Sequence, residues 1–268
     1  MSIRLYDIML GSERRPGMLN VLVLSLPSAD GRRRASRAEL GRYGMKFEFF
    51  DALDGERLPQ EIFGCRYDAA TNARAFKRPL SAGEISCYLG HLQMWSHLVE
   101  SGAKATLILE DDFEFTRDPV TFLNEIAGYD LSNVIVKLDG NAPRRSRRLQ
   151  QIGDTWLVTN SLLPPRTTGY IIGAGPAAIL LERRKRFFRP VDIDLKCHWE
   201  HRVPILVTEK ALIRERQHNV SSLENARAEN KPSTLTRFWR NLSYQAAFRW
   251  GIRTAGPYEI AQLKRKAR

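Results

Sequence analysis

Three consecutive carboxylates, Glu110, Asp111 and Asp112, follow the apolar segment Thr106–Leu109 in the stretch TLILEDDFEF. A short apolar run of this kind is typical of a buried strand, so the acids come at its end. Side chains alternate along an extended backbone, which puts Glu110 and Asp112 on one side and Asp111 on the other. Two carboxylates on one side suit Mg²⁺ or Mn²⁺ bridging a diphosphate. The alternative is a solvated acidic turn.

A glycine pattern suggests a different chemistry. Gly173, Gly175 and Ala178 match G-x-G-x-x-A in the stretch YIIGAGPAAILL, which is the fingerprint of dinucleotide-binding proteins. That fingerprint needs an acid at the end of a second strand roughly 20 residues further on. Here the next segment is rich in arginine, and Asp192 comes early, directly after Pro190 and Val191. A dinucleotide-dependent enzyme that uses the GAGPAA segment is therefore the alternative hypothesis.

Two smaller patterns also involve reactive side chains. Cys87 and His91 are four residues apart and share one face of a predicted helix, but a third metal ligand is not evident. We interpret them as a buried cysteine beside a hydrogen-bonded histidine. Asp192 and Asp194 form a second acid-x-acid pair in the stretch VDIDL. Either carboxylate could act as a general base.

The charge balance indicates an acidic partner. The chain has 42 Lys+Arg against 30 Asp+Glu, a formal net charge of +12. Such an excess suits nucleic acid, anionic lipid or a phosphorylated small molecule, and a nucleic-acid-binding protein is a further alternative. Three widely separated cysteines argue against a disulfide framework and indicate a reducing compartment. With a poor signal peptide and no apolar run long enough for a membrane span, we expect a cytoplasmic protein.

The elements that must position these groups alternate between strands and helices. Apolar or alternating runs predict strands at 20–26, 46–50, 106–110, 134–139, 156–159, 169–173 and 204–213. Helical spacing predicts helices at 31–43, 81–101, 118–127 and 175–187. Asp30 is expected to cap the first helix, and Ser81 with Glu84 forms a capping box for the second. The alternation indicates an α/β protein with a mainly parallel sheet flanked by helices.

The composition changes near residue 220, so we predict one catalytic domain over 1–222 and a separate tail over 223–268. The tail begins with a polar loop and continues as a basic amphipathic helix with an apolar stripe of Leu235, Phe238, Trp239, Leu242 and Ala246. Two interpretations stay open. The helix either packs back on the domain or lies on a membrane surface.

Several segments, taken in order, resemble glycosyltransferase family 25, the lipooligosaccharide galactosyltransferase-like proteins. They are VLVLSLPSADGRRR, FEFFDALDGERL, LSAGEISCYLGHLQMW, LILEDDFEF, TTGYIIGAGPAAILL and PVDIDL. The third resembles the family's G-E-x-x-C-x-x-S-H-x-x-x-W helix, except that Gly90 stands where serine is usual. The resemblance covers about residues 19–222 and is carried by the ordered set rather than by any single segment.

The resemblance implies a GT-A-like, Rossmann-type fold and an inverting transfer of a hexose, galactose above all, from a UDP-sugar. The acceptor would be a lipid-linked oligosaccharide of a lipopolysaccharide core, and nucleic acid would not be a partner. The basic surface would in turn suit a phosphorylated acceptor reached by peripheral contact with an anionic inner membrane. Mn²⁺ or Mg²⁺ would be the cofactor. The same resemblance accounts for the glycine pattern.

The site residues then take roles. Glu110 and Asp112 would hold the metal ion, which would neutralise charge on the leaving diphosphate. Asp192 or Asp194 would be the base that takes the proton of the acceptor hydroxyl. The donor nucleotide would be bound by Leu26, Asp51, Asp111 and His91.

Overall fold

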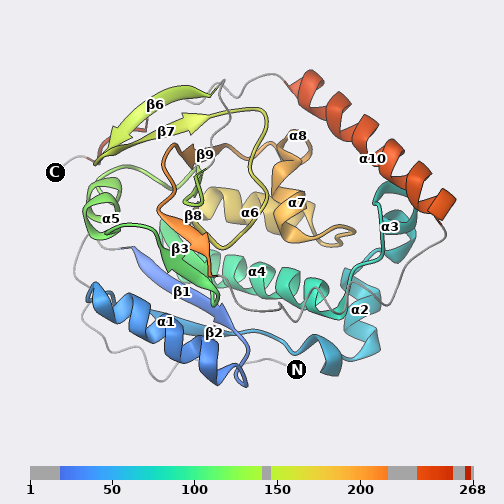
Figure 1. Ribbon diagram of the computed structural model, residues 1–268, viewed down its shortest axis with the longest axis horizontal. Helices are drawn as coiled ribbons and strands as arrows, with labels where there is room; N and C mark the ends of the chain where they lie inside the picture. The colour runs from blue at the N-terminus through green and yellow to red at the C-terminus, as the bar shows by residue number, and fades with distance from the viewer. Residues whose placement is uncertain (1–18, 141–145, 217–233, 256–262, 267–268) are drawn as a thin grey trace.

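The computed structural model describes residues 19–140, 146–216, 234–255 and 263–266. Within these ranges an eight-stranded sheet forms the centre of the molecule (Figure 1). In spatial order its strands are β2 (Glu48–Asp51), β1 (Asn20–Ser25), β3 (Ala105–Glu110), β8 (Gly169–Gly173), β5 (Ile135–Lys137), β9 (Ile205–Thr208), β7 (Thr155–Thr159) and β6 (Arg147–Ile152). Strands β8 and β7 run antiparallel to both of their neighbours, and the other pairs are parallel. Because only these two of the eight described strands are reversed, the prediction of a mainly parallel sheet is confirmed.

Helices cover both faces of the sheet and give an α/β/α arrangement (Figure 1). Helices α4 (Ala82–Glu100), α6 (Ala174–Arg183) and α7 (Val191–Lys196) pack on one face, and α1 (Asp30–Arg42) and α5 (Val120–Ile126) pack on the other. The strands alternate accordingly. In β3, Ile108 packs on the α4 side, while Leu107 and Leu109 pack on the α1 side. The sheet therefore has an apolar core on each face.

Local sequence signals explain most helix ends. Ser81 and Glu84 form the predicted capping box of α4, because each side chain bonds the backbone N–H of the other. The cap expected from Asp30 is wrong: Ala29 is the N-cap of α1, and Asp30 is the first helical residue, with its negative charge at the positive end of the helix. Gly44 stops α1 as predicted, at a φ of +62°.

The segment predicted as one strand over 204–213 divides between two sheets. β9 belongs to the central sheet, and β10 (Ile213–Glu215) pairs antiparallel with β4 (Phe113–Phe115). The chain leaves the sheet because the N–H groups of Leu212 and Ile213 both donate to the carbonyl of Leu138. This small second sheet follows the acidic end of β3 directly, so Glu215 comes opposite Phe113 in the register.

Short helices link these parts: η1 (Gly55–Arg57), α2 (Gln60–Arg66), α3 (Ala69–Ala75) and α8 (His198–His201). The tail forms one longer helix, α10 (Thr234–Ala255), which runs beside α3 (Figure 1). Arg240 donates from Nε to the carbonyl of Phe76 over 2.9 Å, and Tyr244 meets the Phe76 ring edge-on. Phe248 contacts Trp199 at a centroid distance of 5.1 Å. The alternative in which the helix packs back on the domain is confirmed for this part of α10.

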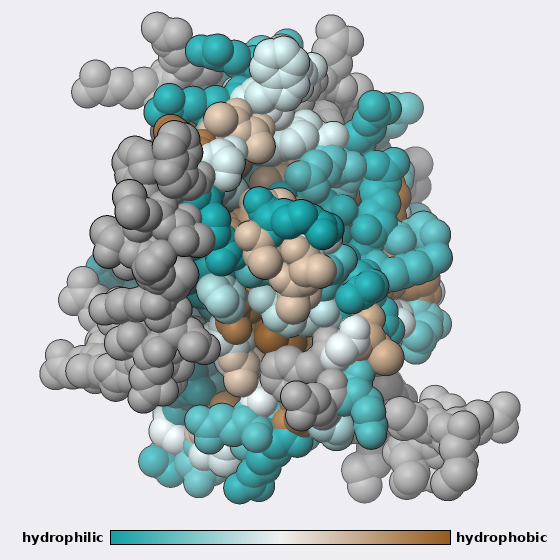
Figure 2. Space-filling model, turned by 90° about the vertical axis from the view of Figure 1, so that its right-hand side faces the viewer, coloured by the Kyte–Doolittle hydropathy of each residue, from teal (hydrophilic) through white to brown (hydrophobic). Residues whose placement is uncertain are grey.

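The face that packs differs from the predicted stripe. Leu242 is 49% exposed and Trp250 is 70% exposed. Ala246 is exposed as well, and the side chains of Leu235, Phe238 and Trp239 lie outside the described residues. The side of the molecule that carries α10 is mostly hydrophilic, with few hydrophobic residues at its surface (Figure 2). None of the described helices is both long and apolar enough to cross a membrane.

Candidate functional site

The carboxyl ends of β1, β2 and β3 meet at one edge of the sheet, where ligands bind in open α/β sheets. Arg33 of α1 contacts the ends of both β1 and β2 at this edge. Its Nε donates to the carbonyl of Leu26 over 3.0 Å, its Nη2 donates to the carbonyl of Ser25 over 3.1 Å, and it forms an ion pair with Asp51. The carboxylate of Asp51 remains half exposed. The structure thus brings two predicted donor-binding residues, Leu26 and Asp51, to one exposed edge beside a cation.

Asp111 turns away from Glu110, as the alternation along the strand predicts. It accepts a hydrogen bond from Ser25 Oγ over 2.6 Å and pairs with Arg32 Nη1 at 3.2 Å. Burial raises the pKa of Asp111, although Ser25 and Arg32 oppose the shift. Its carboxylate therefore joins β1, β3 and α1. Any effect of Asp111 on a donor would pass through Arg32, which is partly exposed.

Glu110 lies on the α4 side and is held in place by two neighbours. Thr167 Oγ1 donates to Glu110 Oε1, and His91 Nε2 lies 3.4 Å from the same oxygen. Burial acts to raise the pKa of Glu110, but the hydrogen bonds from His91 and Thr167 outweigh it, so the pKa of this carboxyl is lowered. Glu110 is therefore an anion at neutral pH.

His91 is fully buried, so it cannot touch a bound nucleotide, and its predicted donor-binding role is corrected. Tyr170 accepts a hydrogen bond from Trp95 Nε1 over 2.9 Å and lies 2.7 Å from His91 Nδ1. The tyrosine hydroxyl can then donate its own proton to Nδ1, which assigns the histidine proton to Nε2, facing Glu110. From its buried position, His91 therefore orients the carboxylate of Glu110 through Nε2.

Asp112 is the residue whose surroundings most favour binding of a cation. Its Oδ1 is buried and has no hydrogen-bond partner among the described residues. Burial raises the pKa of Asp112 to about 7, with further contributions from the negative charges of Glu110 and Glu215. A buried carboxylate among other carboxylates is costly unless a cation compensates it. The residues here therefore fit a divalent ion with hard oxygen ligands.

Glu215 is a site residue that the sequence analysis missed. The backbone N–H of Arg216 donates to the carbonyl of Asp112 over 2.6 Å, which brings the end of β10 to the acid triplet. No local pattern marks Glu215 in the stretch IRER, because its proximity depends on a strand pairing between residues about 100 positions apart.

Cys87 also adjoins this group. Its Sγ, a ring nitrogen of His91 and an oxygen of Glu110 all lie within 4.8 Å of one another. Burial, aided by the charges of Glu110 and Asp192, raises the pKa of the Cys87 thiol well above its usual value. A protonated thiol is a poor metal ligand. The expected hydrogen-bonded histidine is confirmed, whereas Cys87 is half-buried rather than buried.

The two aspartates of α7 have different surroundings. Asp194 is 3% exposed, accepts from Arg184 Nε over 2.6 Å and from Arg189 Nε over 2.7 Å, and also accepts from the hydroxyl of Tyr88. Burial alone would raise the pKa of Asp194, but the charges of Arg189 and Arg184 hold it at about 2. With both oxygens engaged in a buried ion network, Asp194 ties α7 to α4 and to the residues after α6.

Within the part of the chain that the structure describes, Asp192 makes no such ion pair. Burial raises its pKa, the charge of Glu110 adds to the shift, and Lys137 opposes it. Glu110 and Lys137 are therefore electrostatic neighbours of Asp192. The sequence analysis did not identify Lys137, which lies at the end of β5, as a site residue. A single lysine within the apolar stretch VIVKLD gives no local signal of a functional role.

The glycine pattern serves packing. β8 is reversed, so Gly173 pairs with Ala105 at the start of β3, at the opposite sheet edge from Glu110. A Cβ on Gly173 would lie 2.1 Å from the carbonyl oxygen of Leu131. The N–H groups of Gly173 and Gly175 donate to backbone carbonyls, so they are not available to a pyrophosphate. The dinucleotide hypothesis is therefore wrong for this segment.

Comparisons with known proteins identify relatives of this chain. Residues 18–195 match a family model described as glycosyltransferase family 25 (LPS biosynthesis protein). A glycosyltransferase 25 family member of Aedes aegypti is 27% identical over 63% of this chain and 28% of its own length. The lacto-N-neotetraose biosynthesis glycosyltransferase LgtE of Neisseria meningitidis serogroup B is 32% identical over 38% of this chain and 35% of its own.

A third relative is procollagen galactosyltransferase 1 of Danio rerio, which is 28% identical over 37% of this chain and 17% of its own length. The matched part of this chain thus spans about a third or less of each of these relatives.

Proposed function

This chain belongs to glycosyltransferase family 25, and we propose that it transfers a hexose, galactose above all, from a UDP-sugar to a hydroxyl of an oligosaccharide, with inversion at the anomeric carbon. The observation that carries the proposal is the buried, unpartnered Oδ1 of Asp112 among the carboxylates at the end of β3. Relatives whose names refer to a galactosyltransferase and to lacto-N-neotetraose biosynthesis support the choice of sugar and of acceptor.

The donor would bind across the carboxyl ends of β1, β2 and β3. Asp51 would contact the nucleoside, and Arg33 and Arg32 bring positive charge to the same edge. Glu110 and Asp112, with Glu215 beside them, would hold Mn²⁺ or Mg²⁺, which would supply charge neutralisation for the leaving diphosphate. Thr167 and His91 keep Glu110 ionised and correctly turned for this task.

The acceptor would enter from the side of α7. Inversion needs a carboxylate on the face of the sugar opposite the leaving group, where it removes the proton of the attacking hydroxyl. Asp192 fits this role, because Glu110 and Lys137 are among its electrostatic neighbours and it makes none of the ion pairs that hold Asp194. We therefore assign the base to Asp192 and a structural role to Asp194.

The proposal extends to a cytoplasmic enzyme that takes a lipid-linked acceptor at the anionic inner membrane. The net charge of +12 and the three free cysteines support it. On α10, the exposed side chains of Leu242 and Trp250 lie eight residues apart on a helix whose other side packs on the domain. An exposed tryptophan near arginines suits the headgroup region of a bilayer. Nucleic acid is not part of the proposal.

The substitution Asp112→Asn tests the central point. It removes a metal charge but no hydrogen bond to Oδ1, so the variant should fold with an unchanged or higher melting temperature. UDP release from UDP-galactose in the presence of Mn²⁺ should fall by about 10²-fold or more. Thermal stabilisation by UDP-galactose should no longer depend on Mn²⁺.

Asp154→Asn is the matched control. Asp154 is exposed, and its ion pairs with Arg117 and Lys210 include none of the three carboxylates of the acid triplet. This control should keep both the activity and the response to Mn²⁺. If Asp112→Asn also keeps them, the metal role of the acid triplet is refuted.

A further inference from the structure

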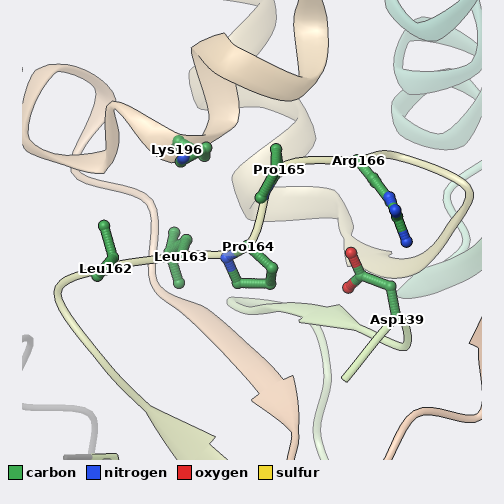
Figure 3. A pocket seen from close by; sticks show the side chains of 7 residues that line it. All are labelled: Asp139, Leu162, Leu163, Pro164, Pro165, Arg166 and Lys196. Carbon is green, nitrogen blue, oxygen red and sulfur yellow. The ribbon is translucent and has the colours of Figure 1, made fainter. Parts of the chain in front are cut away.

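A small pocket lies beside the acidic edge, beyond the end of β5. Its volume is ≈ 290 Å³, and its lining residues are Asp139, Leu162, Leu163, Pro164, Pro165, Arg166 and Lys196 (Figure 3). In the sheet, β8 and β5 follow β3 on the side away from β1 and β2. The pocket is thus separated from the nucleotide half of the sheet by the strand that carries Glu110. Its size is near the lower end for small-molecule sites, roughly 300 Å³, and suits a single sugar ring.

Asp139 supplies an unsatisfied acceptor in this pocket. The residue is 5% exposed, and its Oδ1 has no hydrogen-bond partner among the described residues. Its Oδ2 lies 3.6 Å from Lys137 Nζ. Figure 3 shows the carboxylate turned toward the side of the pocket formed by Arg166. A buried acceptor without a partner is costly, so a ligand that donates a hydrogen bond would be stabilised here.

The wall of the pocket is held rigidly from inside the protein. Lys137 Nζ donates to the carbonyls of Pro164 and Arg166, each over 2.6 Å. Arg166 has a φ of 103°, a conformation that non-glycine residues rarely adopt. The buried lysine therefore fixes the apolar wall of leucines and prolines, and it also balances the charge of Asp139.

Two further cations line the pocket. Arg166 points toward Asp139 in Figure 3, and its charge lowers the pKa of that carboxyl against the larger effect of burial. Lys196, at the end of α7, lies over the ring of Phe248 of α10 at 5.1 Å. Because Lys137 already balances Asp139, the lining leaves Arg166 and Lys196 in excess. Lys196 also has Asp192, the proposed base, among its electrostatic neighbours.

We propose that this pocket is the acceptor subsite and that it selects a sugar carrying a negatively charged group, a carboxylate or a phosphate. The proposal rests on the proposed glycosyltransferase function. Asp139 Oδ1 accepts a hydrogen bond from a sugar hydroxyl, and the leucines and prolines cover the apolar C–H face of the ring. Lys196 binds the anionic group, Arg166 adds positive charge from the side of Asp139, and the neighbouring Asp192 receives the proton of the attacking hydroxyl.

The test uses the full chain with UDP-galactose and three acceptor probes; diamagnetic Mg²⁺ is used in the NMR samples and Mn²⁺ in the activity assays. Methyl β-D-glucopyranoside is neutral, methyl β-D-glucuronide carries a carboxylate, and glucose 6-phosphate carries a phosphate. Their binding is measured by saturation-transfer NMR, which needs no turnover, and their effect on UDP release is measured in parallel. We expect at least one charged probe to half-saturate at about a tenfold lower concentration than the neutral one. The tighter of the two identifies the anionic group.

Substitutions in the pocket, with one control outside it, test which residues cause the preference for a charged probe. Lys196→Met should abolish the advantage of the charged probe, whereas Lys185→Met, which removes an exposed lysine of the turn after α6, should keep it. Asp139→Asn should weaken neutral and charged probes alike, because it alters the hydroxyl contact. Equal affinity for charged and neutral probes, no binding of either charged probe, or a preference that survives in Lys196→Met would each overturn the proposal.

The donor readout separates this proposal from the function on which it rests. UDP-galactose binding and its slow hydrolysis without an acceptor report on the acidic edge alone. If both are absent, the proposed function fails, and the NMR comparison still decides whether the pocket prefers charged sugars. If both are present while the probes do not discriminate, only the assignment of the pocket fails.

Discussion

The clearest structural contrast in the site is between Asp192 and Asp194, which are two residues apart on one short helix. The substitutions Asp194→Asn and Asp192→Asn remove one charge each and keep the size of the side chain. We expect the first to destabilise the protein strongly and the second to leave its stability nearly unchanged while it abolishes transfer.

The magnitude for Asp194→Asn follows from its partners. The side chains of Arg184 and Arg189 are 12% and 6% exposed. Without the charge of Asp194, these two buried cations would keep only the half-exposed Glu200 as an ion-pair partner among the described residues. Breaking a buried ion pair in this way costs about 3–5 kcal/mol. A second route gives a similar size: lowering a pKa from 3.8 to about 2 corresponds to roughly 2 kcal/mol in favour of the charged form. At about 2–4 °C per kcal/mol for a large domain, the melting temperature should fall by about 10 °C.

The assay is thermal unfolding at neutral pH, followed for both variants and for Asp154→Asn as an exposed control. The control removes a surface ion pair and should shift the melting temperature by only about 1–2 °C. In parallel, UDP release with UDP-galactose and an acceptor should be lost in Asp192→Asn. If Asp194→Asn melts like the wild type, or if Asp192→Asn keeps full activity, the division of roles between these two carboxylates is refuted.

Two further outcomes can be checked on the same protein. Gly251→Leu should lower the melting temperature and make α10 accessible to limited proteolysis, because a Cβ at Gly251 would lie 2.1 Å from the indole of Trp199. An unchanged digestion pattern would contradict the packing of α10 on the domain. Burial lowers the pKa of His201 to about 4 from the 6.5 of an unfolded histidine, so its contribution to stability is complete above pH 6.5 and is lost as the pH falls toward 4, by at most about 3 kcal/mol. His201→Gln should flatten the unfolding free energy over that range, and an equally steep profile in the variant would exclude this cause.

Much of the framework could be predicted because its signals are local. The capping box at Ser81 and Glu84 marks the start of α4, and the apolar runs before Ser25 and Glu110 mark β1 and β3. Alternation along β3 placed Asp111 on the opposite side from Glu110. Each of these features depends on residues within a few positions of one another, where backbone geometry alone decides the outcome.

The contacts that complete the site lie outside the reach of such patterns. Glu215 reaches Asp112 only through the pairing of β10 with β4, and Thr167 reaches Glu110 only because β8 runs antiparallel beside β3. Because β8 is antiparallel to β3, the glycine pattern at Gly173 lies at the sheet edge opposite to that of Glu110. A strand's direction and neighbours depend on the whole sheet, so its own residues do not encode them.

By itself, the sequence determined the alternating α/β architecture, the edge at which the acids gather and the family to which the chain belongs. Only the tertiary structure decided that Asp194 is held by Arg184 and Arg189 while Asp192 is not, and that Lys137 pins a wall of the pocket beside Asp139. The two aspartates are nearly equivalent in sequence, and a carboxylate takes its role from the charges and the solvent around it. Those surroundings come from segments far apart along the chain, so folding brings them together and the order of residues does not reveal them.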